Sequence, residues 1–253
     1  MGGVIGAIGA KFVIAATGLL VSASIEGHRL QARIDPGSES STVSARIADQ
    51  VDGRGAPHGA GGVLRRGRPM TIAMSGGTFP VEALAVAPSR PEAGGDFRIG
   101  RDILEGHVFD LDFRSRQIRM VLPYEYARAT RRLIAVDLTP GPDGSWTFPA
   151  SVGGKPVAAT LRLSDPRGAT IGLPSSANGG APLVLAVGTT TLSISDVVRA
   201  APADARAPVV LGLGAFDGRR VMLDLPHRLF WIDPRGSRAG GETGRSHRIR
   251  SGA

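Results

Sequence analysis

The chain carries the stretch Ser-Ile-Glu-Gly-His-Arg-Leu at residues 24–30 and a matching stretch, Ser-Val-Gly-Gly-Lys-Pro-Val, at residues 151–157. In both, apolar and polar residues alternate on either side of a glycine turn, which is the pattern of a β-hairpin. Positions 127 residues apart keep their character: Ala23/Ala150, Ile25/Val152, Gly27/Gly154, Leu30/Val157, Ala32/Ala159 and Ile34/Leu161. This self-similarity predicts a fold built from two copies of one unit.

A second matched block, with an offset of 112 residues, closes each copy. Ile99-Gly100 corresponds to Leu211-Gly212, and a strand-like segment follows in each copy, at residues 117–122 and 229–232. The remaining matches are Leu104/Phe216, Gly106/Gly218, Phe109/Val221, Leu111/Leu223, Asp112/Asp224 and Phe113/Leu225. Because the offset falls from 127 to 112, the second copy is shorter in its middle.

The repeat sets the expected organisation of the chain. We expect a first lobe at residues 1–122, a linker at 123–132 and a second lobe at 133–234, followed at 235–253 by a basic tail rich in Gly, Ser and Arg that we predict to be disordered. The chain has 36 glycines and 18 prolines in 253 residues, which favours short strands and many turns, so the fold class is all-β. Short helices are expected in the linker and at residues 44–51, 101–105 and 193–200.

Composition excludes several classes of function. The chain has no cysteine, which rules out disulfides, thiolate metal sites and cysteine nucleophiles. Its five histidines show no metal-binding spacing and it has no nucleophile-elbow motif, so we predict no metal, no cofactor and no serine hydrolase site. The net charge of +8 comes from scattered arginines without a long basic run, so we expect no nucleic-acid partner.

The apolar run from Phe12 to Ala23 has two interpretations. It is too short to span a bilayer, so no stable membrane span is predicted. Residues 1–23 could act as an export signal, which would place the protein in a periplasm, or the run could be a strand of the fold in a cytoplasmic protein. The repeat favours the strand.

The order of motifs resembles the retropepsin-like aspartic protease family, including its bacterial members. That family has an apolar-Asp-Thr-Gly-Ala/Ser turn, then an apolar-Leu-Gly block, then an apolar-Asp-Phe strand. The first copy supplies Ile34-Asp35-Pro36-Gly37-Ser38, Ile99-Gly100 and Leu111-Asp112-Phe113 in that order. The resemblance implies a two-lobed, pepsin-like pair of β-barrels with a cleft between them. It also implies that Asp35 is catalytic and that Gly37 and Ser38 contact a polypeptide substrate.

Hydrolysis of a peptide by this chemistry requires two carboxylates that share a water molecule. One must be ionised to act as a base, while the other must be protonated to polarise the carbonyl group. Two acids held a few ångströms apart cannot both ionise, so their pKa values separate and supply the two roles. Each lobe provides one aspartate, which is why two lobes, from one chain or from a dimer, are needed.

The sequence departs from the family at this point. Pro36 replaces a threonine that in the family ties the two turns together, and proline has neither the hydroxyl nor the amide donor. With the 127-residue offset, Arg162-Leu163-Ser164 replaces the second Asp-Thr-Gly. An alternative register inserts three residues and places Asp165 at the site. A monomer with Arg162 there is expected to be inactive, unless the first lobes of two chains pair in a homodimer.

Two further features remain open. Gly59 to Val63, with Gly61 and Gly62 as candidate substrate contacts, is either a flap over the cleft or an ordinary loop, and residues 68–86 form a hairpin that turns at Gly76-Gly77. Asp112 and Asp224 occupy equivalent positions and are expected to stabilise turns.

Two functions therefore stay under consideration: an aspartic endopeptidase that uses Asp35, and a catalytically inactive relative that binds peptides by strand addition.

Overall fold

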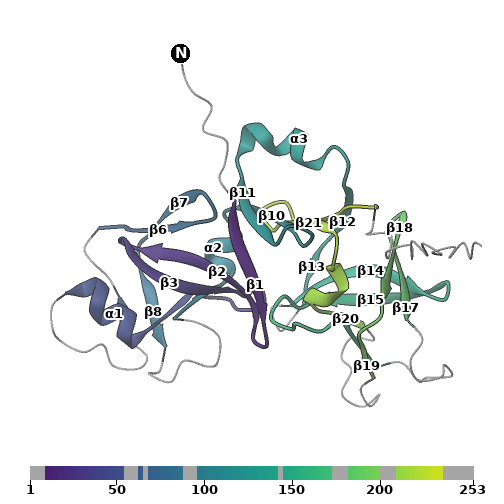
Figure 1. The fold of residues 1–253 in the computed structure, drawn as a ribbon, viewed down its shortest axis with the longest axis horizontal. Coiled ribbons are helices and arrows are strands. Elements are labelled where there is room, and N and C mark those ends of the chain that lie inside the picture. Colours follow the sequence, from purple (N-terminus) through teal and green to yellow (C-terminus); the bar gives the residue numbers. More distant parts are fainter. Residues whose placement is uncertain are drawn as a thin grey trace, which may run out of the picture.

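Short strands dominate the computed structural model, which describes residues 9–53, 62–64, 68–87, 96–141, 145–172, 182–199 and 209–235 (Figure 1). The first repeat contains β1 (Ala10–Ala15), β2 (Gly18–Ile25), β3 (His28–Ile34), β4 (Thr42–Ser44), α1 (Ala45–Asp52), β5 (Val63–Leu64), β6 (Met70–Met74), β7 (Gly77–Val81), β8 (Leu84–Ala87), β9 (Phe97–Ile99), α2 (Arg101–Leu104), β10 (Val108–Asp112) and β11 (Gln117–Val121). The linker contains η1 (Pro123–Glu125) and α3 (Tyr126–Thr130). The second repeat contains β12 (Ile134–Asp137), β13 (Thr139–Pro140), β14 (Trp146–Val152), β15 (Lys155–Leu161), β16 (Ala169–Ile171), β17 (Leu183–Val187), β18 (Thr190–Ile194), β19 (Val197–Arg199), β20 (Val209–Leu211), η3 (Leu213–Phe216), β21 (Arg220–Asp224) and β22 (Leu229–Ile232). The all-β fold class is confirmed.

The two predicted hairpins form, with tight turns at equivalent places. β2 pairs with β3 around Glu26-Gly27, and β14 pairs with β15 around Gly153-Gly154. All four turn residues have positive φ, as a two-residue hairpin turn requires. The alternating apolar residues of β2 and β3, among them Ile25 and Ala32, are fully buried.

Each hairpin continues into the same crossed arrangement of strands. β3 runs parallel to β9 with Ala32 opposite Phe97, and β15 runs parallel to β20 with Ala159 opposite Val209. In the first repeat, β4 lies antiparallel on the other edge of β9. In the second repeat, β16 lies antiparallel on the other edge of β20. The offsets of 127 and 112 residues are thus both preserved in the strand register, so the sequence repeat is a structural repeat.

The two repeats meet through a pair of equivalent strands, β10 and β21. These strands are antiparallel, and Asp110 lies opposite Met222, its own counterpart in the second repeat. A pairing of this kind places a local twofold axis between the two residues. Figure 1 shows β10 and β21 between the strands of the two repeats, with α3 on the same side of the molecule.

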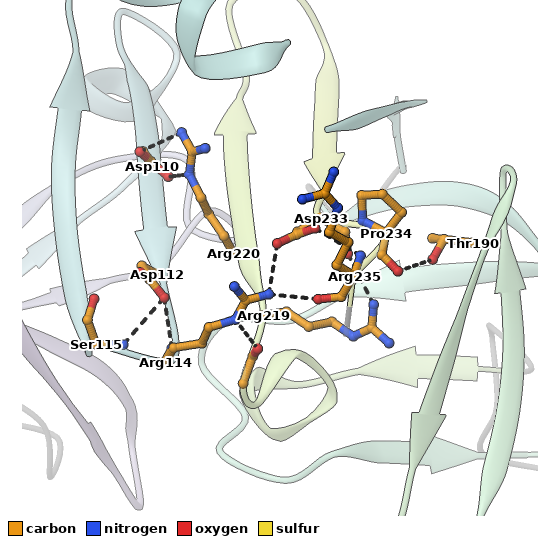
Figure 2. A network of polar contacts seen from close by, with 11 residues as sticks. Asp110, Asp112, Arg114, Ser115, Thr190, Arg219, Arg220, Asp233, Pro234 and Arg235 are labelled. Atoms are coloured by element: carbon orange, nitrogen blue, oxygen red, sulfur yellow. Dashed lines mark hydrogen bonds and ion pairs between the residues drawn. The ribbon is translucent and has the colours of Figure 1, made fainter. Parts of the chain in front are cut away.

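Polar contacts reinforce this junction (Figure 2). The carboxylate of Asp110, 6% exposed, accepts hydrogen bonds from Arg220 of the second repeat at 2.7 and 2.9 Å and from Arg119 at 2.9 Å. Arg114 of the first repeat donates to the Gly218 carbonyl at 2.6 Å and to Asp233 at 2.8 Å. Guanidinium groups therefore connect the two repeats at two places, along β10 and just after its end.

A row of phenylalanine rings extends the core across the same junction. Phe113 stacks edge-on against Phe12 at 5.3 Å and lies 6.0 Å from Phe216 of the second repeat. Phe216 contacts Phe230 at 5.3 Å, and Phe230 contacts Phe148 at 6.1 Å. These distances are typical of favourable aromatic pairs, so the repeats share one continuous hydrophobic core.

The turn role predicted for Asp112 and Asp224 is confirmed, and Asp224 has a second role. Asp112 accepts from the backbone amides of Arg114 and Ser115, and Asp224 accepts from that of His227. Asp224 is fully buried and its side chain also accepts hydrogen bonds from the Tyr126 hydroxyl, the His227 ring at 2.7 Å and the Trp231 indole at 3.4 Å. It therefore anchors the linker helix to the second repeat.

Two local predictions were wrong. Of the predicted helix 193–200, the described residues 193–199 are not helical; β18 and β19 occupy most of this stretch because buried and exposed side chains alternate from Thr190 to Ile194, which suits a strand. The predicted hairpin 68–86 ends earlier, at Val81, and turns at Ser75-Gly76. The remaining strand of that stretch, β8, instead lies parallel to β4.

The short helices predicted near residues 44–51 and 101–105 and the strand predicted for the apolar run are confirmed. Helices α1 and α2 lie where short helices were expected, and the Ser44 hydroxyl caps α1. The apolar run from Phe12 to Ala23 forms β1 and most of β2. Within the described residues, no helix has the length and hydrophobicity needed to span a membrane. Of the predicted basic tail, only Arg235 lies within the described residues.

Candidate functional site

A cleft of about 400 Å³ lies where the two repeats face each other, and we call it the central cleft. The first repeat contributes Asp35, Gly37, Ser38 and Arg98, and the second contributes Ser145, Leu161, Arg162, Leu163 and Ser164. The turn that carries Asp35 thus lies across the cleft from the turn that carries Arg162. The cleft falls within the size range of pockets that bind small molecules and peptide side chains.

Backbone hydrogen bonds define which residues of the two turns correspond. In the first repeat, Asp35 donates to Ile99 at 3.0 Å, Ser38 to Asp35 at 3.1 Å and Arg101 to Ser38 at 2.8 Å. In the second, Arg162 donates to Leu211 at 2.8 Å, Asp165 to Arg162 at 3.1 Å and Leu213 to Asp165 at 2.8 Å. Each bond in one repeat has its counterpart in the other. Arg162 therefore occupies the position of Asp35, and Asp165 that of Ser38.

Asp35 is a partly buried carboxylate at the edge of the cleft. Its side chain is 17% exposed, and its Oδ2 lies 3.6 Å from the Arg33 guanidinium. Among the described residues that line the cleft, Asp35 is the only one with a carboxylate. The arrangement therefore provides one acidic group where hydrolysis by a carboxylate pair requires two.

Asp165 belongs to the structure of its turn rather than to the cleft lining. Its carboxylate accepts hydrogen bonds from the Arg167 side chain at 2.8 and 2.9 Å and from the Arg167 amide at 3.0 Å. Burial alone raises the pKa of Asp165, but the hydrogen bonds and charge of Arg167, with a contribution from Arg162, outweigh burial and lower it. Asp165 is therefore held ionised and engaged away from the cleft.

Close packing of a glycine explains the apolar-Gly motif in both repeats. A Cβ atom on Gly100 would lie 2.6 Å from the backbone of Ser40, and one on Gly212 would lie 2.3 Å from the Arg167 carbonyl. No side chain fits in either place, so glycine lets each loop cross close to the turn that carries Asp35 or Arg162. The two turns are fixed in the same way although their side chains differ.

A polar network that the sequence analysis missed holds the loop after Asp35. The Ser41 hydroxyl donates to Asp102 at 2.6 Å and accepts from the Gly100 amide at 2.8 Å. Asp102 also accepts from the Ser41 amide at 2.9 and 3.0 Å. The sequence contained only a weak signal for this network: Asp102 comes two residues after Gly100 of the Ile99-Gly100 motif.

The predicted site residues fall into three groups. Asp35, Gly37, Ser38 and Arg162 line the central cleft. Gly62 does not appear in its lining; the carbonyl of Gly62, just before β5, accepts from the Val86 amide at 2.8 Å. Gly61 and most of the candidate flap lie outside the described residues.

Together, the crossed strands, the duplicated turn and the cleft define the two-lobed, pepsin-like fold. Among solved structures, the chain is similar to basic 7S globulin from soybean, with 10% identity, a TM-score of 0.59, and coverage of 90% of this chain and 95% of that one. It is likewise similar to conglutin gamma, a basic 7S globulin from lupine seeds, with 10% identity, a TM-score of 0.58, and coverage of 90% and 94%. At 10% sequence identity, the similarity to these two structures shows a shared fold. No family model matches the chain, and no curated protein matches it.

Proposed function

We propose that this protein is a catalytically inactive member of the pepsin-like fold that binds an extended peptide in the central cleft. The observation that carries the proposal is Arg162 in the position equivalent to Asp35. A guanidinium stays protonated at all physiological pH values, so it cannot alternate with Asp35 as base and acid. A water molecule beside Asp35 would lack the second carboxylate that the reaction needs.

The alternative route, a dimer that brings two Asp35 residues together, has little structural support. Strand β10 is already paired on both edges, with β11 and with β21 of the same chain. The second repeat therefore fills the position that a second copy of the first repeat would need. The two similar solved structures are also named as globulins, and neither is named as a peptidase.

Peptide binding is the activity that the remaining features of the site favour. Gly37 is exposed at the cleft, which allows a peptide backbone to approach the chain closely, and Ser38 lies beside it. An extended peptide could add its backbone hydrogen bonds there, as in strand addition. Gly37 and Ser38 are the proposed ligand contacts.

The competing function is aspartic endopeptidase activity through Asp35. It is favoured by one observation, the presence of Asp35 in a turn with the family's Gly and Ser at the edge of a cleft. It also requires a second acid from outside the described lining of that cleft.

One experiment separates the two functions. The full chain and an Asp35→Asn variant are incubated with a mixed peptide library between about pH 3 and pH 7, the range in which a carboxylate pair is active. Mass spectrometry detects cleavage, and affinity capture detects binding. We expect no cleavage by either protein and peptide capture by both. Cleavage by the natural chain that is lost in Asp35→Asn would establish the endopeptidase instead.

A further inference from the structure

We infer that the central cleft recognises a carboxylate group of its peptide, which Arg98 and Arg162 bind from the two repeats. The inference rests on the proposed peptide binding and adds the chemical group that is recognised. It follows from the charged groups that line the described cleft, two guanidinium groups and one carboxylate, and from a buried nitrogen of Arg98 that has no hydrogen-bond partner among the described residues.

The positive charge begins with two arginines on neighbouring strands. Arg33 of β3 lies directly opposite Arg98 of β9 in the parallel register. Their neighbours along the strands, including Ile34 and Ile99, are buried in the core, so both arginines project from the other face of the sheet. Like charges placed directly opposite each other destabilise a sheet, so this pair has a cost unless an anion lies near it.

The fold itself does not require this pair. The equivalent positions in the second repeat are Thr160 and Val210, which lie opposite each other in the same parallel register. Neither of them carries a charge. The same backbone arrangement therefore forms with neutral side chains. The two arginines are specific to the first repeat, and Arg98 is the one that lines the cleft.

The carboxylate of Asp35 lies beside the first arginine of this pair. It contacts Arg33 at 3.6 Å, which is a long ion pair. The Nε of Arg98 is buried and has no hydrogen-bond partner among the described residues, although the side chain lines the cleft. The guanidinium of Arg98 has thus lost part of its hydration without full compensation, which an anion bound to its remaining N–H groups would offset.

Arg162 adds a third guanidinium from the opposite wall. It is exposed in the cleft, and Asp165, whose pKa the charge of Arg162 helps to lower, is hydrogen-bonded by Arg167. The described lining of the cleft therefore holds two guanidinium groups, Arg98 and Arg162, against the single carboxylate of Asp35. The planar fork of a guanidinium matches a carboxylate, which it can bind through two parallel hydrogen bonds.

The peptide carboxylate has two possible sources, a free C-terminus or the side chain of Asp or Glu. Four sets of fluorescein-labelled octapeptides distinguish the two sources. The sets combine a free or an amidated C-terminus with Glu or Gln at a central position, so that each combination is tested once. Binding of each set to the full-length protein is measured by fluorescence anisotropy. We expect one of the two carboxylates to strengthen binding by about 10-fold or more.

The variants Arg98→Gln and Arg162→Gln test which residues recognise the carboxylate. Each should weaken binding of the preferred peptide by about 10-fold or more and leave binding of its neutral counterpart unchanged, as expected for a directly coupled pair. Arg98→Lys, which keeps the charge but loses the fork, should give an intermediate loss. Arg29→Gln is the matched control, because Arg29 lies on β3 but lines a different groove of the first repeat.

Thermal unfolding separates recognition from a structural role. We expect Arg98→Gln to be as stable as the natural chain or more stable, because it removes a poorly compensated charge. A large loss of stability in this variant, with equal weakening of all four peptide sets, would overturn the inference. Equal binding of peptides with and without a carboxylate would also overturn the inference, but it would leave the proposed peptide binding intact. If no peptide binds, both proposals are overturned.

Discussion

At the scale of single residues, positions 35 and 162 have the same backbone and opposite charges. The backbone amide of each residue donates to the last carbonyl of the parallel neighbouring strand. The backbone carbonyl of each accepts from the amide of the residue three positions later. Because these bonds involve only the backbone, the side chain can change from carboxylate to guanidinium without altering the turn. A guanidinium in place of a second carboxylate is therefore compatible with full retention of the fold.

A single glycine sets how closely the two repeats approach beside this turn. Gly18, the first residue of β2, has φ of +117°, and a Cβ atom there would lie 2.9 Å from the Cα of Ser164. Gly27 also has positive φ, at +83°, but a Cβ atom there would meet nothing within 4 Å. The two glycines therefore share a backbone requirement, and only Gly18 adds a contact with the opposite repeat.

We predict that Gly18→Ala destabilises the protein more than Gly27→Ala does. The second change should cost about 1 kcal/mol from backbone strain alone, whereas the first adds a clash with a backbone and should cost about 2 kcal/mol or more. Chemical denaturation of both variants measures the difference. Equal losses would mean that the turn of Ser164 moves aside without cost.

At the scale of elements, the linker is held by a buried carboxylate rather than by its own helical length. Helix α3 spans only Tyr126–Thr130, which is too short to be stable alone. The hydroxyl of Tyr126 donates to the buried Asp224, and its ring contacts His227 at 5.5 Å. Burial, followed by the hydrogen bond to Asp224, raises the pKa of Tyr126 to about 12.

This contact predicts a dependence of stability on alkaline pH. Because the folded state favours the neutral phenol, its contribution is complete below the ordinary pKa of 10.0 and is lost as the pH rises through about 12. Tyr126→Phe should lose about 1–2 kcal/mol at neutral pH and should lack this alkaline loss. Thermal unfolding as a function of pH tests both points. Tyr124→Phe, in which the natural side chain is 70% exposed, is the control and should behave like the natural chain.

At the scale of the whole molecule, one sheet and one core cross from the first repeat to the second. Strands β10 and β21 pair along their full length, and the row of phenylalanine rings continues beneath them. Surfaces joined in this way do not separate independently, so we expect the repeats to unfold as one cooperative unit. The position of the cleft is therefore a property of the joined pair.

The variant Arg220→Gln tests the junction. It removes one of the two guanidinium groups on Asp110 but keeps Arg119, so we expect a loss of about 1–3 kcal/mol and a single unfolding transition. Calorimetry measures both quantities, with the exposed Arg131→Gln as control. Two separate transitions in the natural chain would show that the repeats are independent domains.

Much of the fold could be predicted because its signals are local and occur twice. Glycine turns flanked by alternating apolar residues specify the hairpins, and the duplicated Ile99-Gly100 block specifies the loop crossing. The stretch 193–200 was misjudged because its polar and apolar residues fit either a short helix or two strands, and pairing with β16 decided the outcome. Arg33 and Arg98 were missed because they are far apart in the sequence and meet only through the parallel register of β3 and β9.

The sequence by itself determined the duplicated β-unit, the place of Asp35 in its turn and the replacement of the second aspartate, since each depends on residue type and spacing. Only the tertiary structure decided that Arg162, and not Asp165, lies across the cleft from Asp35. It also decided that Arg98 joins them there. The reason is physical: a cleft between two repeats is formed by contacts between distant segments, and the charge that it presents depends on which side chains those contacts leave exposed.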